Sequence, residues 1–312
     1  MPLLLILRGR GPLRIAESAG RGISDYTELR VDSPEEAESA VVGIVEDPRW
    51  NAVALNNVVK TSPTATLARS LARSRGWLIF ELATNVAPRV RLEGSWEDFY
   101  RTKRERKARH NLDRALRRLQ EVPGFEVTHH HESHDVEAAL VEAFALDAAN
   151  PKGVHGRWAF SGDLARPFYR EVARRFAERR WFELSMMRAA GGPLAFAYSF
   201  VWEGTYYYYK ARAAVNDPLS RFSPGAVLLK LLLERSFDQG LTRFDLMLGD
   251  EPYKAAWATE HDPVGSMYLA RRGSANAVAW WTLKETRRLR ERARRSARLR
   301  GLVARGIRVI GR

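Results

Sequence analysis

The chain has 312 residues, enough to bury a sizeable core and more typical of two domains than of one. Hydrophobic residues make up 45% and charged residues 28%, which is ordinary for a globular protein. Cysteine is absent, which excludes disulfides, thiolate metal sites and a cysteine nucleophile. The apolar runs are shorter than the ~20 residues needed to cross a bilayer, so we expect a cytoplasmic protein.

The first hundred residues alternate short apolar runs with helix signals. Strands are predicted at Leu3–Leu7, Ala52–Val58 and Trp77–Glu81. Helices are predicted to start at Ser33, which is followed by Pro and Glu residues, and at Thr64, ahead of a stop at Gly76. Residues 1–95 therefore look like an α/β unit that is too short to be a complete domain.

A long helix is predicted from Ser95 to about Gln120, ending at Pro123-Gly124. Apolar residues recur along it at helical spacing and mark a buried face. It also carries many basic residues: Lys103, Arg104, Arg106, Lys107, Arg109, Arg114, Arg117 and Arg118. Two interpretations remain open, a solvated face or a basic wall that attracts an anionic ligand.

The second half of the chain predicts a mixed sheet. A strand at Phe125–His131 is followed by two helices, about 135–148 and around Phe168–Phe176, and then by three strands separated by tight turns. An apolar helix, a strand, a short helix and a last strand follow. The segments are, in order, Trp181–Arg188, Leu194–Trp202, Thr205–Ala213, Pro224–Asp238, Arg243–Leu248, Tyr253–Trp257 and Gly265–Ala270. We expect an α+β fold whose mostly antiparallel sheet is flanked by helices, with residues 96–275 as the complete domain.

The first chemical signal stands before the apolar helix. Ser223 is a natural N-cap, Pro224 suits the first helical position, and Gly225 allows close approach to the backbone. A helix N-terminus offers unpaired N–H groups and about half a positive charge, which suits a pyrophosphate. An ordinary capped helix explains the same string. The predicted cofactor-binding residues are Arg221, Phe222, Ser223, Pro224, Gly225 and Ala226.

The second signal follows the strand at 243–248. Gly249-Asp250 stands just beyond the carboxyl end of that strand, where open α/β sheets place ligands. Asp250 is placed to accept a proton or to hold an ammonium group, and Tyr253-Lys254 begin a short helix beside it. A turn with surface charges is the alternative interpretation.

In this order, the two signals resemble the GNAT superfamily of acyl-CoA N-acyltransferases. More closely, the chain is similar to a branch with two tandem GNAT-like halves, which includes the FemAB-type transferases and proteins described as cellulose-biosynthesis acetyltransferases. The resemblance rests on Ser223-Pro224-Gly225, on Gly249-Asp250 and on Tyr253-Lys254, and it extends from about Trp96 to Leu269. It implies a GNAT-like sheet over residues 96–275, with residues 1–95 as an incomplete first half.

The resemblance also implies a mechanism, in which an amine attacks the thioester of acyl-CoA directly in a ternary complex. The reaction needs a base, donors for the oxyanion and an acid for the thiolate. Asp250 is the predicted base with Asp245 in reserve, and Tyr253 is the predicted acid, with Lys254 beside it. Tyr208 and Lys210 are predicted to face the acceptor. Acetyl-CoA is the expected donor, and no metal is expected.

The histidine-rich run at 129–135 invites a metal interpretation, because His129 and His131 share one face of a strand and His134 follows. No cysteine or patterned carboxylate supports zinc, so a polar edge strand running into a helix cap is favoured.

The net charge of +14 is concentrated in one segment. Residues 271–312 hold 14 of the 51 Lys and Arg residues but only two of the 37 acids, which leaves the rest almost neutral. Leu289, Ala293 and Ala297 recur at helical spacing, so residues 276–312 are predicted to form a basic amphipathic helix. Such a helix suits an anionic membrane surface on the inner face of the membrane, through residues 279–312. Nucleic acid is a less favoured partner, and a solvated extension is the third interpretation.

Three functions compete. The leading one is an N-acyltransferase acting on an amino group of a cell-envelope or saccharide precursor, a small-molecule or glycan-precursor acceptor. The second is a FemAB-type transferase that uses aminoacyl-tRNA. The third is a non-catalytic module that binds a membrane or a polyanion.

Overall fold

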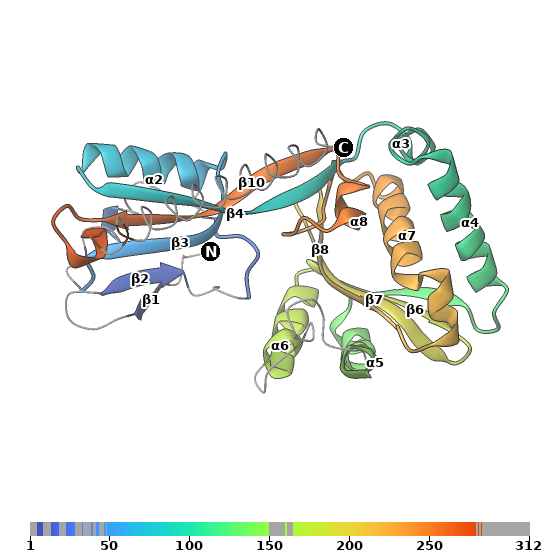
Figure 1. Ribbon diagram of the computed structural model, residues 1–312. Coiled ribbons are helices and arrows are strands. Elements are labelled where there is room, and N and C mark those ends of the chain that lie inside the picture. The colour runs from blue at the N-terminus through green and yellow to red at the C-terminus, as the bar shows by residue number, and fades with distance from the viewer. Residues whose placement is uncertain are drawn as a thin grey trace, which may run out of the picture. The chain divides into compact units, whose positions relative to one another are not determined.

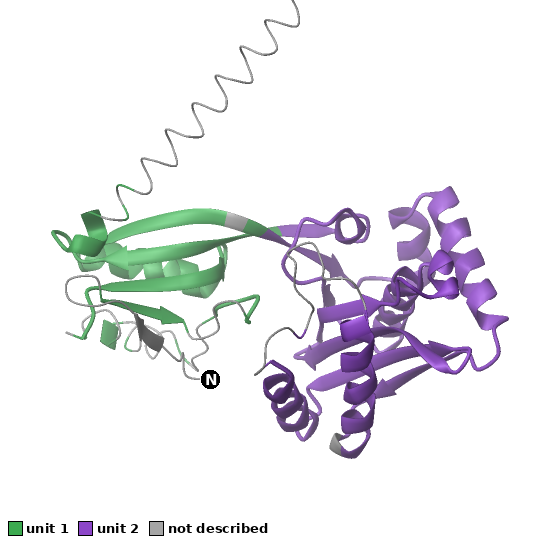
Figure 2. Ribbon diagram, turned by 60° about the horizontal axis from the view of Figure 1, so that its bottom comes forward, with its two compact units in different colours: residues 1–85, 262–312 green, residues 86–261 purple. Residues whose placement is uncertain are grey.

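The computed structural model describes residues 49–149 and 165–278. Outside these ranges it describes 5–8, 14–18, 23–28 and the single positions 33, 39, 42, 43, 47, 160, 280 and 282. The chain forms two compact units, residues 1–85 with 262–312 and residues 86–261 (Figure 2). The predicted helix after Ser33 and nearly all of the predicted basic helix at 276–312 lie outside the described residues.

The first unit is a small sheet with one described long helix. Its strand order is β1 (Leu5–Arg8), β2 (Ile15–Ser18), β3 (Ala52–Val59), β10 (Glu260–Ala270) and β4 (Leu78–Arg91). β2 and β3 are parallel, and β3 and β10 are antiparallel. Helix α2 (Pro63–Ser74) starts at Ser62, whose hydroxyl accepts the Ala65 N–H, and buries its alanine and leucine face against β3.

The boundaries of the units differ from the expected 1–95 and 96–275. The chain returns to the first unit after residue 261, because β10 pairs with β3 from Val264 opposite Val59 to Ala270 opposite Ala52. A pairing between strands about two hundred residues apart leaves no local signal in the sequence, so chain order alone placed the last strand in the second half.

The second unit contains the mixed, mostly antiparallel sheet that the sequence predicted. Its strand order is β4, β9 (Arg243–Asp245), β8 (Thr205–Ala213), β7 (Gly192–Trp202), β6 (Phe182–Ala189) and β5 (Glu126–His130). The meander β6-β7-β8 is antiparallel and turns through Ala190-Gly191 and Glu203-Gly204, all with positive φ. β8 and β9 are parallel because the helix between them returns the chain to the same edge.

Helices cover both faces of this sheet (Figure 1). One face packs against α3 (Trp96–Lys103), α4 (Arg106–Gln120) and α7 (Pro224–Asp238). The opposite face packs against α5 (Ser133–Ala149) and α6 (Ala165–Ala177). The strands alternate accordingly, with Met187 facing α7 and Met186 facing α5 and α6. This confirms the predicted sheet flanked by helices.

Two predicted elements are shorter than expected. The single helix over 95–120 is broken into α3 and α4, because Arg104 adopts extended backbone angles of φ −111° and ψ 132°. The strand predicted over Arg243–Leu248 ends at Asp245, because Met247 and Gly249 adopt positive φ. The first break places Arg104 at the cavity described below. The remaining elements of this unit are the 3-10 helix η2 (Pro218–Phe222) and α8 (Pro252–Ala255).

Among the described helices, none combines the length and the apolar character required to span a membrane.

Candidate functional site

A cavity of about 620 Å³ opens within the second unit, on the face of the sheet that carries α4 and α7. Its volume is in the range of pockets for small ligands. The walls come from the start of α4, from β8, from the N-terminus of α7 and from α8. Most of the lining is apolar, and none of the residues that line it is Asp, Glu or His.

The N-terminus of α7 forms one wall of the cavity. Ser223 occupies the N-cap position as predicted, but its side chain caps nothing, and its backbone is left-handed with φ 51°. Its carbonyl accepts the N–H groups of Ala226 and Val227. Pro224 has no N–H, so Gly225 carries the one N–H of this turn that has no acceptor among the described residues. An anion in the cavity would find this donor open.

Close packing favours glycine at position 225. A Cβ atom there would lie 3.1 Å from the Cβ of Ala213 on β8, which is tighter than ordinary contact. The helix therefore begins directly against the end of the strand, and its positive end lies at the cavity wall.

The cavity takes in half of the predicted cofactor-binding residues. Ser223, Gly225 and Ala226 line it. Pro224 is buried, Phe222 packs partly buried against the core, and the exposed Arg221 stacks on Phe222 at 4.8 Å, so none of these three lines the cavity.

The Gly249–Lys254 segment is held in shape by a buried lysine. Lys254 is 6% exposed, and its Nζ donates to the carbonyl of Leu248 at 2.5 Å and pairs with Glu251 at 3.1 Å. Gly249 has a φ of 139°, which residues with a side chain rarely adopt, and a Cβ there would lie 1.9 Å from Glu251 Oε2, so glycine is favoured beside this ion pair. Lys254 thus acts as a structural tie, and the loop it holds presents the neighbouring Tyr253 to the cavity.

Two phenol groups face the cavity. Tyr208 of β8 is 7% exposed, and its hydroxyl has no hydrogen-bond partner among the described residues. Burial and the nearby Tyr253 raise the pKa of Tyr208 well above its usual value. Burial, with a smaller contribution from Glu251, raises the pKa of the Tyr253 hydroxyl to about 12. Both phenols therefore stay neutral near pH 7 and are able to donate hydrogen bonds.

Lys210 does not share the face of Tyr208, contrary to the prediction that both meet the acceptor. The register of β7 and β8 shifts between Tyr198 and Phe200, which inserts a bulge into β8. Lys210 consequently lies over the rings of Tyr169 and Tyr209, in the core on the α5 and α6 side, at 5.0 and 4.7 Å.

The two predicted carboxylates lie apart from the cavity. Asp245 is 1% exposed, accepts from Arg89 Nε at 2.9 Å and from the Met247 N–H at 2.8 Å, and therefore holds β9 to β4 rather than standing in reserve as a base. Asp250 is exposed in the loop before α8 and does not line the cavity. Its role as base stays a prediction.

Arg104 lines the cavity although the sequence did not single it out. Its guanidinium lies 4.7 Å from the ring of Trp257, and its Nη1 donates to the Ala256 carbonyl at 3.3 Å. Its Nε is buried and has no partner. The sequence could not distinguish Arg104 as a site residue, because it is one of many basic residues in what is predicted to be a continuous helix.

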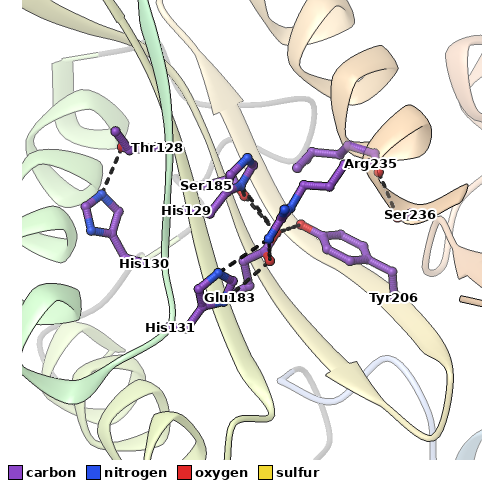
Figure 3. A network of polar contacts seen from close by, with 10 residues as sticks. Thr128, His129, His130, His131, Glu183, Ser185, Tyr206, Arg235 and Ser236 are labelled. Atoms are coloured by element: carbon purple, nitrogen blue, oxygen red, sulfur yellow. Dashed lines mark hydrogen bonds and ion pairs between the residues drawn. The ribbon is translucent and has the colours of Figure 1, made fainter. Parts of the chain in front are cut away.

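His129 and His131, from the histidine-rich run, join a network around a buried carboxylate, and β5, which carries them, is the edge strand that the sequence favoured (Figure 3). Glu183 is 1% exposed and accepts hydrogen bonds from Tyr206 and Ser185, at 3.1 and 3.0 Å. The other groups that point at it are His129, His131 and Arg235, at 3.6, 3.5 and 3.4 Å. His134 instead lies beside Glu132 and Asp135. Over the part of the chain that the structure describes, no three His, Asp or Glu residues are placed as metal ligands.

A helix N-terminus that opens into a cavity after a meander strand agrees with the acyltransferase-type domain that the sequence led us to expect. Residues 106–255 match the model of the acetyltransferase (GNAT) domain. The chain carries a GNAT-type domain over these residues and is an enzyme of the GNAT acyltransferase type. Domains of this type generally use acyl-CoA.

Solved structures share the fold across both units. FemX has a TM-score of 0.60 and 11% identity, over 85% of this chain and 83% of FemX. The C-terminal domain of a putative lysylphosphatidylglycerol synthetase from Agrobacterium fabrum has a TM-score of 0.55 and 16% identity, over 89% and 83%. L-PGS from Bacillus licheniformis has a TM-score of 0.54 and 12% identity, over 88% and 82%. At these identities the likeness shows the fold alone, and no curated protein matches the chain.

Proposed function

We propose that the protein is an N-acyltransferase that moves an acyl group from acyl-CoA to an amine, with acetyl-CoA as the first candidate donor. The observation that carries the proposal is the cavity at the start of α7. It lies within the GNAT domain, contains the open Gly225 N–H and two neutral phenols, and has no acidic lining residue. Its volume and its positive helix end suit an anionic, thioester-bearing ligand.

The N-terminus of α7 is the part of the cavity where the residues present fit the phosphates of CoA. The Gly225 N–H is open, and Ala226 at the third helical position is exposed in the cavity wall. Ser223 adds a hydroxyl that is not used in capping. These groups would hold the anionic part of the donor, while apolar lining such as Leu229 would exclude water from the thioester.

The proposed reaction is direct transfer. The amine nitrogen bonds to the acyl carbon, the carbon–sulfur bond breaks, CoA leaves as a thiolate, and the amine proton passes to a base. With a pKa of about 12, Tyr253 is a weak acid beside a thiol of pKa about 8.5, so it acts better as a hydrogen-bond donor to the oxyanion or the thiolate than as the proton donor. The exposed Asp250 remains the proposed base.

The proposed acceptor is an amino group on a cell-envelope or saccharide precursor, as in the tandem branch that the sequence resembles. The segment 279–312 is proposed to bind an anionic membrane surface and so to bring the enzyme to such precursors. Of this segment, the structure describes only positions 280 and 282.

Ala226 offers a test that does not disturb folding. A Glu at the third position of a helix is favourable to the helix, and its charge would stand where the donor phosphates are proposed to bind. We expect calorimetric titration with acetyl-CoA to give at least tenfold weaker binding for Ala226→Glu and near-normal binding for the neutral, equally large Ala226→Gln. If neither acetyl-CoA nor longer acyl-CoAs bind the unmodified protein, acyl-CoA is not the donor.

A transferase that uses aminoacyl-tRNA is the second candidate. Two observations favour it, the single open N–H in the first turn of α7 and the exposed basic residues of α4, such as Arg106, Lys107 and Arg117. Transfer from a crude cell extract that disappears after ribonuclease treatment would support this candidate over acyl-CoA.

A further inference from the structure

We propose that Arg104 binds an anionic group of the acceptor, a phosphate or a carboxylate, so that the acceptor is an amine that also carries a negative charge. This inference rests on the proposed function, which assigns the donor to the α7 end of the same cavity.

The guanidinium of Arg104 is held in place while part of it stays unused. Stacking over Trp257 and the bond from Nη1 to the Ala256 carbonyl fix its plane. Its Nε is buried without a partner, and Nη2 has no acceptor among the described residues. Arginine binds carboxylate and phosphate through two parallel N–H donors, and a buried donor that lacks an acceptor is costly. A ligand anion in the cavity would supply an acceptor for Nη2, and a shift of the side chain would bring Nε within its reach.

The start of α4 adds to the positive potential at Arg104. The N–H groups of Lys107 and Ala108 have no acceptor in the described part of the chain, and the N-cap Glu105 makes no side-chain bond to the helix. Ala108 and Ala226 line the same cavity, and Asp113 lies 3.9 Å from Lys230 further along both helices. The helices α4 and α7 are therefore parallel, and both direct their positive ends to this cavity.

The two anion-binding groups lie on different walls. Gly225 belongs to the wall of α7 and β8, where it packs against Ala213. Arg104 belongs to the wall of α8, through its contacts with Ala256 and Trp257. A reaction between two bound substrates needs a binding site for each and reacting atoms between them.

The phenols supply the groups between these walls. Tyr208 comes from β8 and Tyr253 from α8, and the two interact electrostatically. Tyr208 is buried with its hydroxyl unpartnered in the cavity. We therefore place the transfer at the phenols, the donor at Gly225 and the charged end of the acceptor at Arg104.

The side-chain N–H resonances of arginine provide a direct test. Inorganic phosphate, and separately acetate, is titrated into the full-length protein labelled with nitrogen-15, with and without saturating acetyl-CoA. We expect one Nε resonance, missing in Arg104→Lys, to shift saturably with phosphate or acetate in both conditions. Arg104→Lys should weaken phosphate binding at least tenfold, whereas Arg117→Lys, on the exposed surface of α4, should leave it unchanged.

Three results would overturn the inference. The Arg104 resonance does not respond to either anion, acetyl-CoA displaces the phosphate, or the two lysine variants weaken binding equally. The second result would mean that Arg104 binds the donor. The third would mean that phosphate is attracted by the overall positive charge of the surface and not by a specific site at Arg104. If phosphate binds through Arg104 and acetyl-CoA does not bind at all, the anion site is supported and the acyl-CoA donor of the proposed function fails. Thermal unfolding of both variants shows whether each is folded.

Discussion

The two ends of α7 carry polar clusters of opposite character on the same face of one sheet. They are about 15 Å apart, because ten residues separate Gly225 from Arg235. At the Arg235 end, Glu183 is surrounded by donors, and the buried atoms left without a partner are Arg235 Nε and Ser199 Oγ, on the strand position opposite Glu183. At the Gly225 end, the Gly225 N–H, the Tyr208 hydroxyl and Arg104 Nε have no partner within the part of the chain that the structure describes. We therefore expect the first cluster to stabilise the fold and the second to receive a ligand.

The largest expected effect on stability comes from Glu183→Ala. The substitution leaves the partly buried Arg235 and the buried Tyr206 and Ser185 hydroxyls without their acceptor. Removing one partner of a buried ion pair costs about 3 to 5 kcal/mol of unfolding free energy. Urea denaturation measures the loss, and Glu178→Ala, in an exposed pair with Arg174, should cost less than about 1 kcal/mol. Equal effects of the two variants would contradict the comparison.

The stabilisation by Glu183 should depend on pH. Burial alone would raise its pKa, but the interactions with His129 and the charge of Arg235 outweigh burial and lower the pKa from 4.5 to about 2. A group with a lowered pKa stabilises the fold above its unfolded pKa and loses this effect as the pH falls. The stability difference between the unmodified protein and Glu183→Gln should therefore be full at pH 6 and shrink between pH 4.5 and 2.

Tyr253→Phe should affect the reaction and leave the fold intact. Loss of one positioned hydrogen-bond donor typically costs about 100-fold in rate. Because the Tyr253 side chain is half exposed and makes no tie to the core, the unfolding free energy should change by less than about 0.5 kcal/mol. Thiol release from acyl-CoA in the presence of an acceptor amine measures the rate. An unchanged rate would remove Tyr253 from the mechanism.

Asp245 and Asp250, which the sequence predicted as two candidate bases, should differ in their effects on stability and on transfer. Asp245→Asn weakens the buried bond to Arg89, so it should cost about 2 kcal/mol of unfolding free energy. Asp250→Asn lies on the surface and should leave stability within about 0.5 kcal/mol. If Asp250 is the base, its variant should slow transfer at least tenfold, with the loss greatest at low pH where the amine is protonated. Normal transfer by Asp250→Asn would exclude it as the base.

The smallest expected effect is at Ser223. Its left-handed backbone is strained for serine and comfortable for glycine, and its side chain caps nothing. Ser223→Gly should therefore change the unfolding free energy by less than about 1 kcal/mol, and a gain would show as a higher midpoint in thermal unfolding. A loss above about 1 kcal/mol would mean that the hydroxyl has a structural role.

Local signals predicted the parts of the site that depend on one stretch of chain. Pro224 and Gly225 fix the start of α7, and Gly249 fixes the turn before α8, so these positions could be predicted from residue type. The face of Lys210 depends on a bulge in β8, and the partner of Asp245 stands 156 residues away in β4. The position of Arg104 in the cavity depends on the break between α3 and α4, and the apolar spacing of the sequence continues through that break without a signal. Such features arise from packing, which leaves no periodic trace in the sequence.

The most direct test of the contrast between the two ends of α7 is backbone amide exchange with and without acetyl-CoA, followed residue by residue by NMR. The account predicts that the Gly225 amide, open in the free protein, exchanges at least tenfold more slowly when acetyl-CoA is bound. The amides of Glu183 and Ser185 should exchange at the same rate in both conditions. An unchanged rate at Gly225 in the presence of bound acetyl-CoA would contradict the assignment of the α7 N-terminus as the donor site.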